Sequence, residues 1–177
     1  MGNFLIFEIN DKSLKALWGR NVLRDTQIVG CVVERLDTSS EEELFKVISS
    51  IIIKRKLQKY KPLIVCLPRH RVTLRNLRFP STDDKELENI VKLNLVQQVP
   101  YAKEDIIYSY LTLWKTSKGF ASVLLGIVHK EVLRKQFYIF ERLNLYPENV
   151  LISTMGLMEF LRKARIARAQ DTIVKAY

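Results

Sequence analysis

Residue types that mark specialised protein classes are scarce in this chain. Its 177 residues include 2 cysteines, 5 prolines and 6 glycines. Collagen-like, low-complexity and disordered chains are rich in glycine, proline or charge, so these classes are excluded. An apolar fraction of 47% is ordinary for a globular protein, and the length suits one large domain or two small ones.

The two cysteines give no sign of a disulfide or a metal site. Cys31 and Cys66 each lie in an apolar run, and no histidine or further cysteine stands at ligand spacing from either. This pattern favours two buried free thiols on neighbouring strands. Such cysteine use fits the reducing cytosol.

Long apolar runs are absent as well. No segment approaches the roughly 18 consecutive apolar residues that a membrane-spanning helix needs. Residues 1–8 carry neither the basic start nor the small-residue cleavage site of a signal peptide. The sequence therefore predicts a soluble cytoplasmic protein.

Enzyme motifs are also missing. No Ser-His-Asp arrangement, Walker loop, GxGxxG or HExxH motif occurs. The two histidines, His70 and His129, stand far apart in the sequence, without partners that would make a catalytic or metal site. We therefore predict no catalytic residues, no metal site and a role in holding other proteins together.

Charge, by contrast, is plentiful and unevenly placed. The net charge is +10, and residues 54–78 contain nine basic residues and no acid. The nine are Lys54, Arg55, Lys56, Lys59, Lys61, Arg69, Arg71, Arg75 and Arg78. Such a patch suits phosphates, an anionic membrane surface or an acidic protein partner, and the alternative is an ordinary solvated surface.

The first third of the chain has the pattern of an α/β unit. Apolar, β-branched runs predict strands over 3–9, 13–18, 26–36 and 63–67. Ser40 and Glu43 form a capping-box pattern, in which each side chain caps a backbone amide of the other residue. The apolar spacing that follows predicts a helix over 41–58.

The rest of the chain predicts a second unit. Alternation from Arg71 onward indicates a half-exposed strand, and a slip at Asn76 indicates a bulge, with Arg71, Arg75 and Arg78 forming a basic strand face. Further helices are predicted over 83–98, 131–144 and 155–169, and further strands over 106–114, 120–128 and 149–153. The βαββαβ order is that of a ferredoxin-like subdomain.

One turn has the outline of a phosphate-binding loop. Glu8–Lys15 follows the pattern of acid, apolar residue, turn, small polar residue and lysine seen in the first phosphate loop of actin-like ATPases. The candidate nucleotide-binding residues are Asn10, Asp11, Lys12, Ser13 and Lys15, with backbone amides facing phosphate and lysine neutralising its charge. Asn10 stands where glycine is expected and Asp11 would repel phosphate, so an ordinary hairpin is the alternative.

Several short motifs follow one another in order along nearly the whole chain. They are the hairpin Phe4–Lys15, Leu67-Pro68 before a strand, Leu77-Arg78-Phe79-Pro80 before an acidic helix start, Gln97-Gln98-Val99-Pro100-Tyr101 at the end of that helix, and Glu104–Tyr110 in the next strand. In this order and spacing the chain resembles the N-terminal half of the PilM family of type IV pilus assembly proteins. It is similar also to the cytoplasmic domain of the related type II secretion protein L.

The resemblance implies an α/β chain with the N-terminal half of an actin-like (ribonuclease H-like) fold. Residues 1–68 and 154–177 would form the actin-like core subdomain, and 69–153 the inserted βαββαβ ferredoxin-like subdomain. In the family a second half, which completes the nucleotide site, would begin near Asp171. We therefore expect no cofactor in this chain alone, and ATP is a candidate ligand of a full-length protein.

The resemblance also implies a cytoplasmic scaffold at the inner-membrane face of a type IV pilus or type II secretion platform, held there through partners. The implied partners are the cytoplasmic tail of a membrane-anchored PilN-like protein and, in the secretion relative, a motor ATPase. The residues expected to bind the tail lie at the start of the insertion. They are Leu67, Pro68, Arg69, Arg71, Arg75 and Arg78.

Two other functions are consistent with the sequence. An actin-like ATPase would bind phosphate through Asn10–Lys15. A nucleic-acid-binding protein would use the basic residues of 54–78, with an affinity that falls steeply as salt rises. We expect the scaffold, and no nucleic-acid partner.

Overall fold

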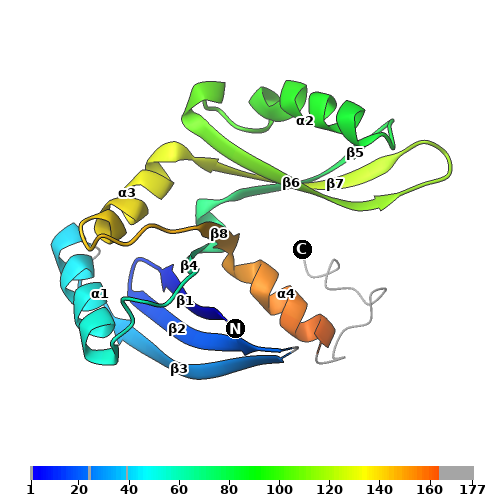
Figure 1. Ribbon diagram of the computed structural model, residues 1–177. Helices are drawn as coiled ribbons and strands as arrows, with labels where there is room; N and C mark the ends of the chain where they lie inside the picture. The colour runs from blue at the N-terminus through cyan, green and yellow to red at the C-terminus, as the bar shows by residue number, and fades with distance from the viewer. Residues whose placement is uncertain (1, 24, 39, 164–177) are drawn as a thin grey trace. The chain divides into compact units, whose positions relative to one another are not determined.

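Two β-sheets divide the chain into two units (Figure 1). The computed structural model describes residues 2–23, 25–38 and 40–163. Unit 1 comprises Met1–Arg69 and Gln136–Tyr177, and unit 2 comprises His70–Lys135. Unit 2 is therefore inserted into unit 1, and it ends at Lys135, well before residue 153.

The sheet of unit 1 has five strands in the order β3-β2-β1-β4-β8. The strands are β1 (Gly2–Ile9), β2 (Ser13–Val22), β3 (Asp25–Arg35), β4 (Leu63–Leu67) and β8 (Asn149–Ile152). The first three form an antiparallel meander, whereas β4 pairs in parallel with β1 and β8 in parallel with β4. Leu5 and Phe7 are buried in the core because the period of two places both on the same face of β1.

The helix α1 (Glu41–Arg55) begins at the predicted cap. The Ser40 hydroxyl oxygen accepts a hydrogen bond from the Glu43 backbone N–H at 3.3 Å. The Glu43 carboxylate does not reach back to Ser40; it accepts from the backbone N–H groups of Asp37 and Thr38, at 2.9 and 2.7 Å. These bonds, and above all the one from the Thr38 hydroxyl, hold the pKa of Glu43 below its ordinary value.

The same helix ends at Arg55, short of the predicted limit at residue 58. Lys56 takes the left-handed conformation, with φ 56° and ψ 45°, and its N–H donates to the Ile53 carbonyl. The N–H of Leu57 donates to the Ile52 carbonyl, and the Leu57 side chain is buried. This pair of bonds is a Schellman motif, in which glycine usually takes the left-handed position. With lysine there, the sequence holds no signal for the stop.

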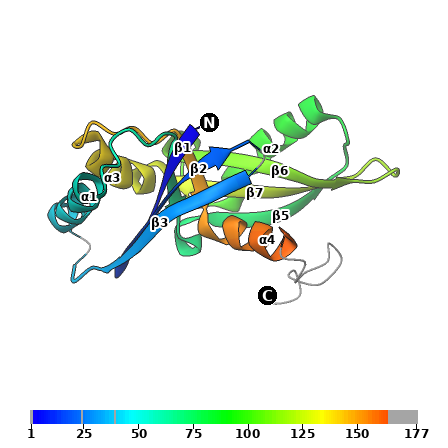
Figure 2. The same ribbon diagram turned by 60° about the horizontal axis from the view of Figure 1, so that its bottom comes forward.

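The helix α3 (Lys130–Glu141) leads the chain back to the sheet of unit 1. Both α1 and α3 lie on one side of that sheet (Figure 2), and the rings of Phe7 and Phe140 are 5.3 Å apart. Just beyond α3, Arg142 forms an ion pair with Glu42 at 2.8 Å and stacks over Phe45. α3 is thus the crossover helix that precedes the parallel strand β8.

Unit 2 consists of a three-stranded sheet with one helix across it. The strands β5 (Thr73–Phe79), β6 (Ile106–Lys115) and β7 (Ala121–His129) are antiparallel and lie in the order β5-β7-β6. The helix α2 (Asp84–Gln98) begins where Asp83 accepts a hydrogen bond from the Glu86 N–H at 2.9 Å. The predicted helix over 83–98 and the predicted hairpin after it are confirmed.

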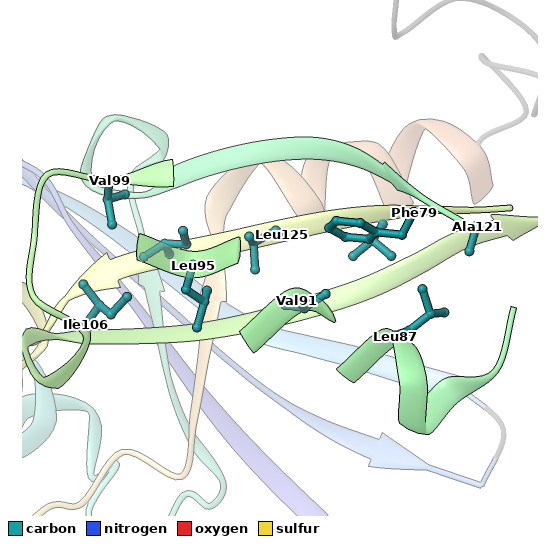
Figure 3. Packing of buried hydrophobic residues seen from close by; sticks show 10 residues of the cluster. Phe79, Leu87, Val91, Leu95, Val99, Ile106, Ala121 and Leu125 are labelled. Atoms are coloured by element: carbon teal, nitrogen blue, oxygen red, sulfur yellow. The ribbon is translucent and has the colours of Figure 1, made fainter. Parts of the chain in front are cut away.

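The core of unit 2 lies between α2 and one face of the sheet (Figure 3). Leu87, Val91 and Leu95, spaced four residues apart, form the buried stripe of α2. The other members are Phe79, Val99, Ile106, Ala121, Val123, Leu125 and Ile127. The strand members alternate along the sequence, so this face of the sheet is apolar by the period of two.

The ferredoxin-like order predicted for the insertion is wrong. β8 pairs with β4 in the sheet of unit 1, and Phe140 of α3 packs against Phe7 there. The core therefore resumes at Gln136 rather than at residue 154, and the insertion has the order β-α-β-β. The local pattern of β8 fits an edge strand in either sheet, and only the long-range pairing decides between them.

The predicted bulge in β5 is also wrong. The register of β5 with β7 runs without a break from Thr73 to Phe79. The irregularity of this sheet lies in β6 instead, between Thr112 and Trp114. As a result, residues of β5 separated by an odd number of positions point to opposite faces.

Two glycines make room for aromatic rings in the sheet of unit 1. A β carbon at Gly30 would lie 2.4 Å from the Trp18 ring. A β carbon at Gly19 would lie 2.4 Å from the Gln27 carbonyl oxygen and 2.5 Å from the Phe4 ring. Gly19 also adjoins the register shift between β2 and β3, where the two backbones come close.

The helix α4 (Ser153–Lys163) follows β8 directly. It begins two positions before the predicted residue 155, and the remainder of the predicted helix to residue 169 lies outside the described residues, as does the tail 171–177. Across residues 2–23, 25–38 and 40–163, no helix combines the length and apolar character needed to cross a membrane.

Candidate functional site

The predicted phosphate loop is the hairpin between β1 and β2. The Asn10 N–H donates to the Ser13 carbonyl at 2.8 Å, which closes a tight turn with Asp11 and Lys12 at its tip. The Lys12 carbonyl accepts a hydrogen bond from the N–H of Leu36, beyond β3, at 3.1 Å. Part of the turn's backbone is therefore used within the fold.

Two polar side chains of this hairpin converge on one carboxylate. The Lys15 ammonium lies 3.5 Å from a Glu8 carboxylate oxygen, and the Asn10 side-chain amide donates to the same oxygen at 2.9 Å. Glu8 and Lys15 are directly opposite each other in the β1–β2 register. A phosphate approaching Lys15 would have to compete with Glu8 for the ammonium.

Glu8 also faces one of the two cysteines. Cys66 of β4 stands beside Glu8 in the parallel register. Burial, with a smaller contribution from the Glu8 carboxylate, raises the pKa of the Cys66 thiol to about 11. The thiol is therefore protonated at neutral pH and a poor nucleophile.

The expectation for the cysteines is only partly right. Both are free thiols. Cys31, however, is exposed on β3, and Cys66 is half-buried. Two strands, β2 and β1, separate β3 from β4, so the cysteines do not lie on neighbouring strands. The apolar run around Cys31 reflects an edge strand rather than a buried one.

The residues predicted to bind a partner tail differ widely in exposure. Leu67 is 1% exposed at the end of β4, and Pro68 is buried as well. Arg69–Arg71 then form the short 3-10 helix η1, in which the Arg71 side chain donates to the His70 ring nitrogen at 3.2 Å. Leu67 and Pro68 are thus buried where the chain leaves β4, and the basic residues after them are more exposed.

The predicted basic strand face is wrong, because Arg71, Arg75 and Arg78 do not share a face. Arg71 precedes β5, in η1. Arg75 lies on the same face of β5 as the core residues Leu77 and Phe79 by the period of two. Arg78 lies on the opposite face.

The environment of Arg78 was not foreseen from the sequence. Its guanidinium carbon is 4.5 Å from the ring centre of Phe120 and 5.9 Å from that of Trp114. Arg78 and Trp114 are both paired with Ser122 of β7, from its two sides. The alternation of side chains between the two faces of each strand would have revealed this contact, had the bulge been placed in β6 instead of β5.

Among the described residues, no group of acidic, histidine and cysteine side chains could hold a metal ion.

No protein-family model and no curated protein matches the sequence. Solved structures do match the fold. A chain of the PilM–PilN type IV pilus biogenesis complex matches with a TM-score of 0.78 and 15% identity, over 93% of this chain and 51% of that chain.

The chain thus shares the α/β fold of this neighbour over most of its length, as the resemblance implied. The cytoplasmic domain of EpsL, an inner-membrane component of the type II secretion system of Vibrio cholerae, matches with a TM-score of 0.56 and 15% identity, over 85% of this chain and 57% of that one. A Bacteroides thetaiotaomicron protein with an actin-like ATPase fold matches with a TM-score of 0.48 and 16% identity, over 90% and 55%. The chain spans about half the length of each, at 51%, 57% and 55%.

Proposed function

We propose that the chain is part of a non-catalytic scaffold at the cytoplasmic face of the inner-membrane platform of a type IV pilus or type II secretion system. The observation that carries this proposal is the match to a chain of the PilM–PilN complex over 93% of the residues. The match to the cytoplasmic domain of EpsL, from a secretion platform, supports the same general role. The scaffold would be held at the membrane through its partners.

The proposed principal partner is the cytoplasmic tail of a membrane-anchored PilN-like protein. Of the sequence-predicted residues, the proposed direct contacts are Arg69 and Arg71, because Leu67 and Pro68 are buried and Arg75 and Arg78 lie on opposite faces of β5. The buried pair Leu67 and Pro68 would hold the η1 segment in place, so that Arg69–Arg71 meet the tail as a preformed surface. A motor ATPase is a further proposed partner, and nucleic acid is not.

Charge reversal in η1 tests the tail-binding site. Arg71→Glu is expected to weaken binding of the cognate tail peptide about tenfold, mainly by slowing association, because charges at the rim of an interface act on the encounter rate. Biolayer interferometry at two salt concentrations measures both rates. Lys59→Glu, in the basic segment after α1, is the matched control and should bind as the unchanged chain does. Equal binding by a folded Arg71→Glu variant would move the site away from η1.

For the nucleotide, we propose that residues 1–177 do not hydrolyse ATP. The ion pair between Lys15 and Glu8 and the tight turn at Asp11 and Lys12 both support this. A phosphate-release assay with the purified chain should give the rate of the buffer alone, with Lys15→Ala as the control. Turnover that disappears in Lys15→Ala would favour the actin-like ATPase instead.

A further inference from the structure

The sheet of unit 2 has a second face, opposite α2, that carries several half-exposed apolar side chains. We call it the open face. Its residues are Leu74, Asn76 and Arg78 of β5, Ser122, Leu124, Gly126 and Val128 of β7, and Ile107, Ser109, Leu111 and Trp114 of β6. Ser122 and Val128 of the central strand are buried. Ile107, Leu111 and Trp114 are 45%, 51% and 46% exposed. Ile107 and Leu111 share this face by alternation, and Trp114 reaches it after the irregularity in β6. Large apolar side chains gathered at half exposure on one face mark an interaction surface.

Arg78 gives the open face a definite charge. Its guanidinium stacks on Phe120 and lies near Trp114, so the charged group is held against these rings, and Arg78 is exposed. Among the described residues, no carboxylate forms an ion pair with it. The neighbouring polar groups are already engaged, since the Ser122 hydroxyl donates to the Asn76 side-chain oxygen at 2.7 Å. Arg78 is thus a positioned cation beside apolar anchors.

The dimensions of the face favour a helix as the occupant. Three strands about 4.8 Å apart make a surface about 10 Å wide, which is the diameter of one helix. The other face of the same sheet is covered in this way by α2. Seven strand residues at about 3.4 Å each give a length of about 24 Å, which a helix of about 16 residues spans.

We propose that the open face binds an acidic amphipathic helix of a protein partner, with a carboxylate on Arg78 and apolar side chains on Leu111 and Trp114. A desolvated guanidinium–carboxylate bond gives such a contact both affinity and orientation. The inference deepens the scaffold function proposed above and rests on it, because it adds the chemistry of a second docking surface.

Other occupants fit less well. Nucleic acid binding needs several phosphate contacts, and the open face carries a single cation. A second copy would have to present its own exposed helix side, where Leu93 and Val96 of α2 stand beside Glu88 and Lys92. Glu88 and Lys92 already pair with each other, so the Glu88 carboxylate is engaged within its own helix.

The test is a selection of peptides of about 16 residues, helical by design, from a random display library on the full 177-residue chain. The enriched peptides are expected to carry a carboxylate within one turn of apolar residues at helical spacing. Their Kd, measured by fluorescence polarisation, should rise about tenfold or more in Arg78→Gln, the usual loss for a charged hydrogen bond. Leu111→Ser, a second variant of the same face, should weaken binding as well.

Arg75→Gln is the matched control, because Arg75 lies on the same strand but on the α2 face. It should bind the enriched peptides as the unchanged chain does, and circular dichroism should find all the variants folded. Enrichment of basic peptides, no enrichment at all, equal binding by Arg78→Gln, or an Arg78-dependent affinity for a single-stranded oligonucleotide would each overturn the proposal. The tail peptide and Arg71→Glu test the scaffold function separately, so the two failures are distinguishable.

Discussion

Replacing Leu95 with alanine is expected to lower the free energy of unfolding of unit 2 by about 2–5 kcal/mol, the usual range for a buried leucine. Leu95 is 0% exposed and belongs to the buried stripe of α2, the helix that packs on this sheet. A small unit has few other apolar contacts with which to fill the cavity, so the loss should fall in the upper part of the range.

The matched control is Leu93→Ala, two positions away on the same helix. Leu93 is 74% exposed, so its truncation should change stability by no more than about 0.5 kcal/mol. Urea titration followed by hydrogen exchange on β7 peptides reports unit 2 within the whole chain. Equal losses for the two variants would mean that the stripe of α2 does not face the sheet.

Replacing Gly19 with alanine is expected to destabilise unit 1 by about 1–3 kcal/mol or more, because the added methyl group overpacks the sheet. The new β carbon would lie 2.4 Å from the Gln27 carbonyl oxygen, which belongs to the backbone of the neighbouring strand. A rotamer change cannot move a backbone oxygen, so β3 would have to shift away from β2.

Gly2→Ala is the control for this substitution, because nothing lies within 4 Å of its added carbon in the same sheet. Thermal unfolding by circular dichroism should give a lower Tm for Gly19→Ala alone. If both variants had the Tm of the unchanged chain, the inference that β2 and β3 lie close together at the register shift would be wrong.

The starts of the helices were predictable from the sequence because their signals are local. Ser40 caps α1 as its capping-box pattern indicated, and the helix predicted from residue 83 begins at Asp84, with Asp83 as its cap. Ends were less predictable: Lys56 takes a conformation that glycine normally marks. The β1–β2 hairpin was also correctly predicted, because its two strands are adjacent in the sequence.

The partner of β8 was not predictable from local pattern. Its pairing with β4 joins Ile64 to Asn149 across the whole insertion, and nothing in its few residues distinguishes the two sheets. The ferredoxin-like order failed for this reason. The face of Arg78 was predicted wrongly for a different reason. One misplaced bulge assigns every later residue of the strand to the opposite face of the sheet.

The insertion of unit 2 within unit 1 has a consequence for the order of folding. Unit 2 is a run of consecutive residues that ends within α3, so the ribosome completes it before it has made β8. Thr73 near its start pairs with Ile127 near its end, so the folded unit brings its own entry and exit onto neighbouring strands. A loop closed in advance adds little entropy cost when β8 later pairs with β4. Folding of unit 2 thereby makes the distant parallel pairing of β8 with β4 nearly local, which speeds the completion of the unit 1 sheet.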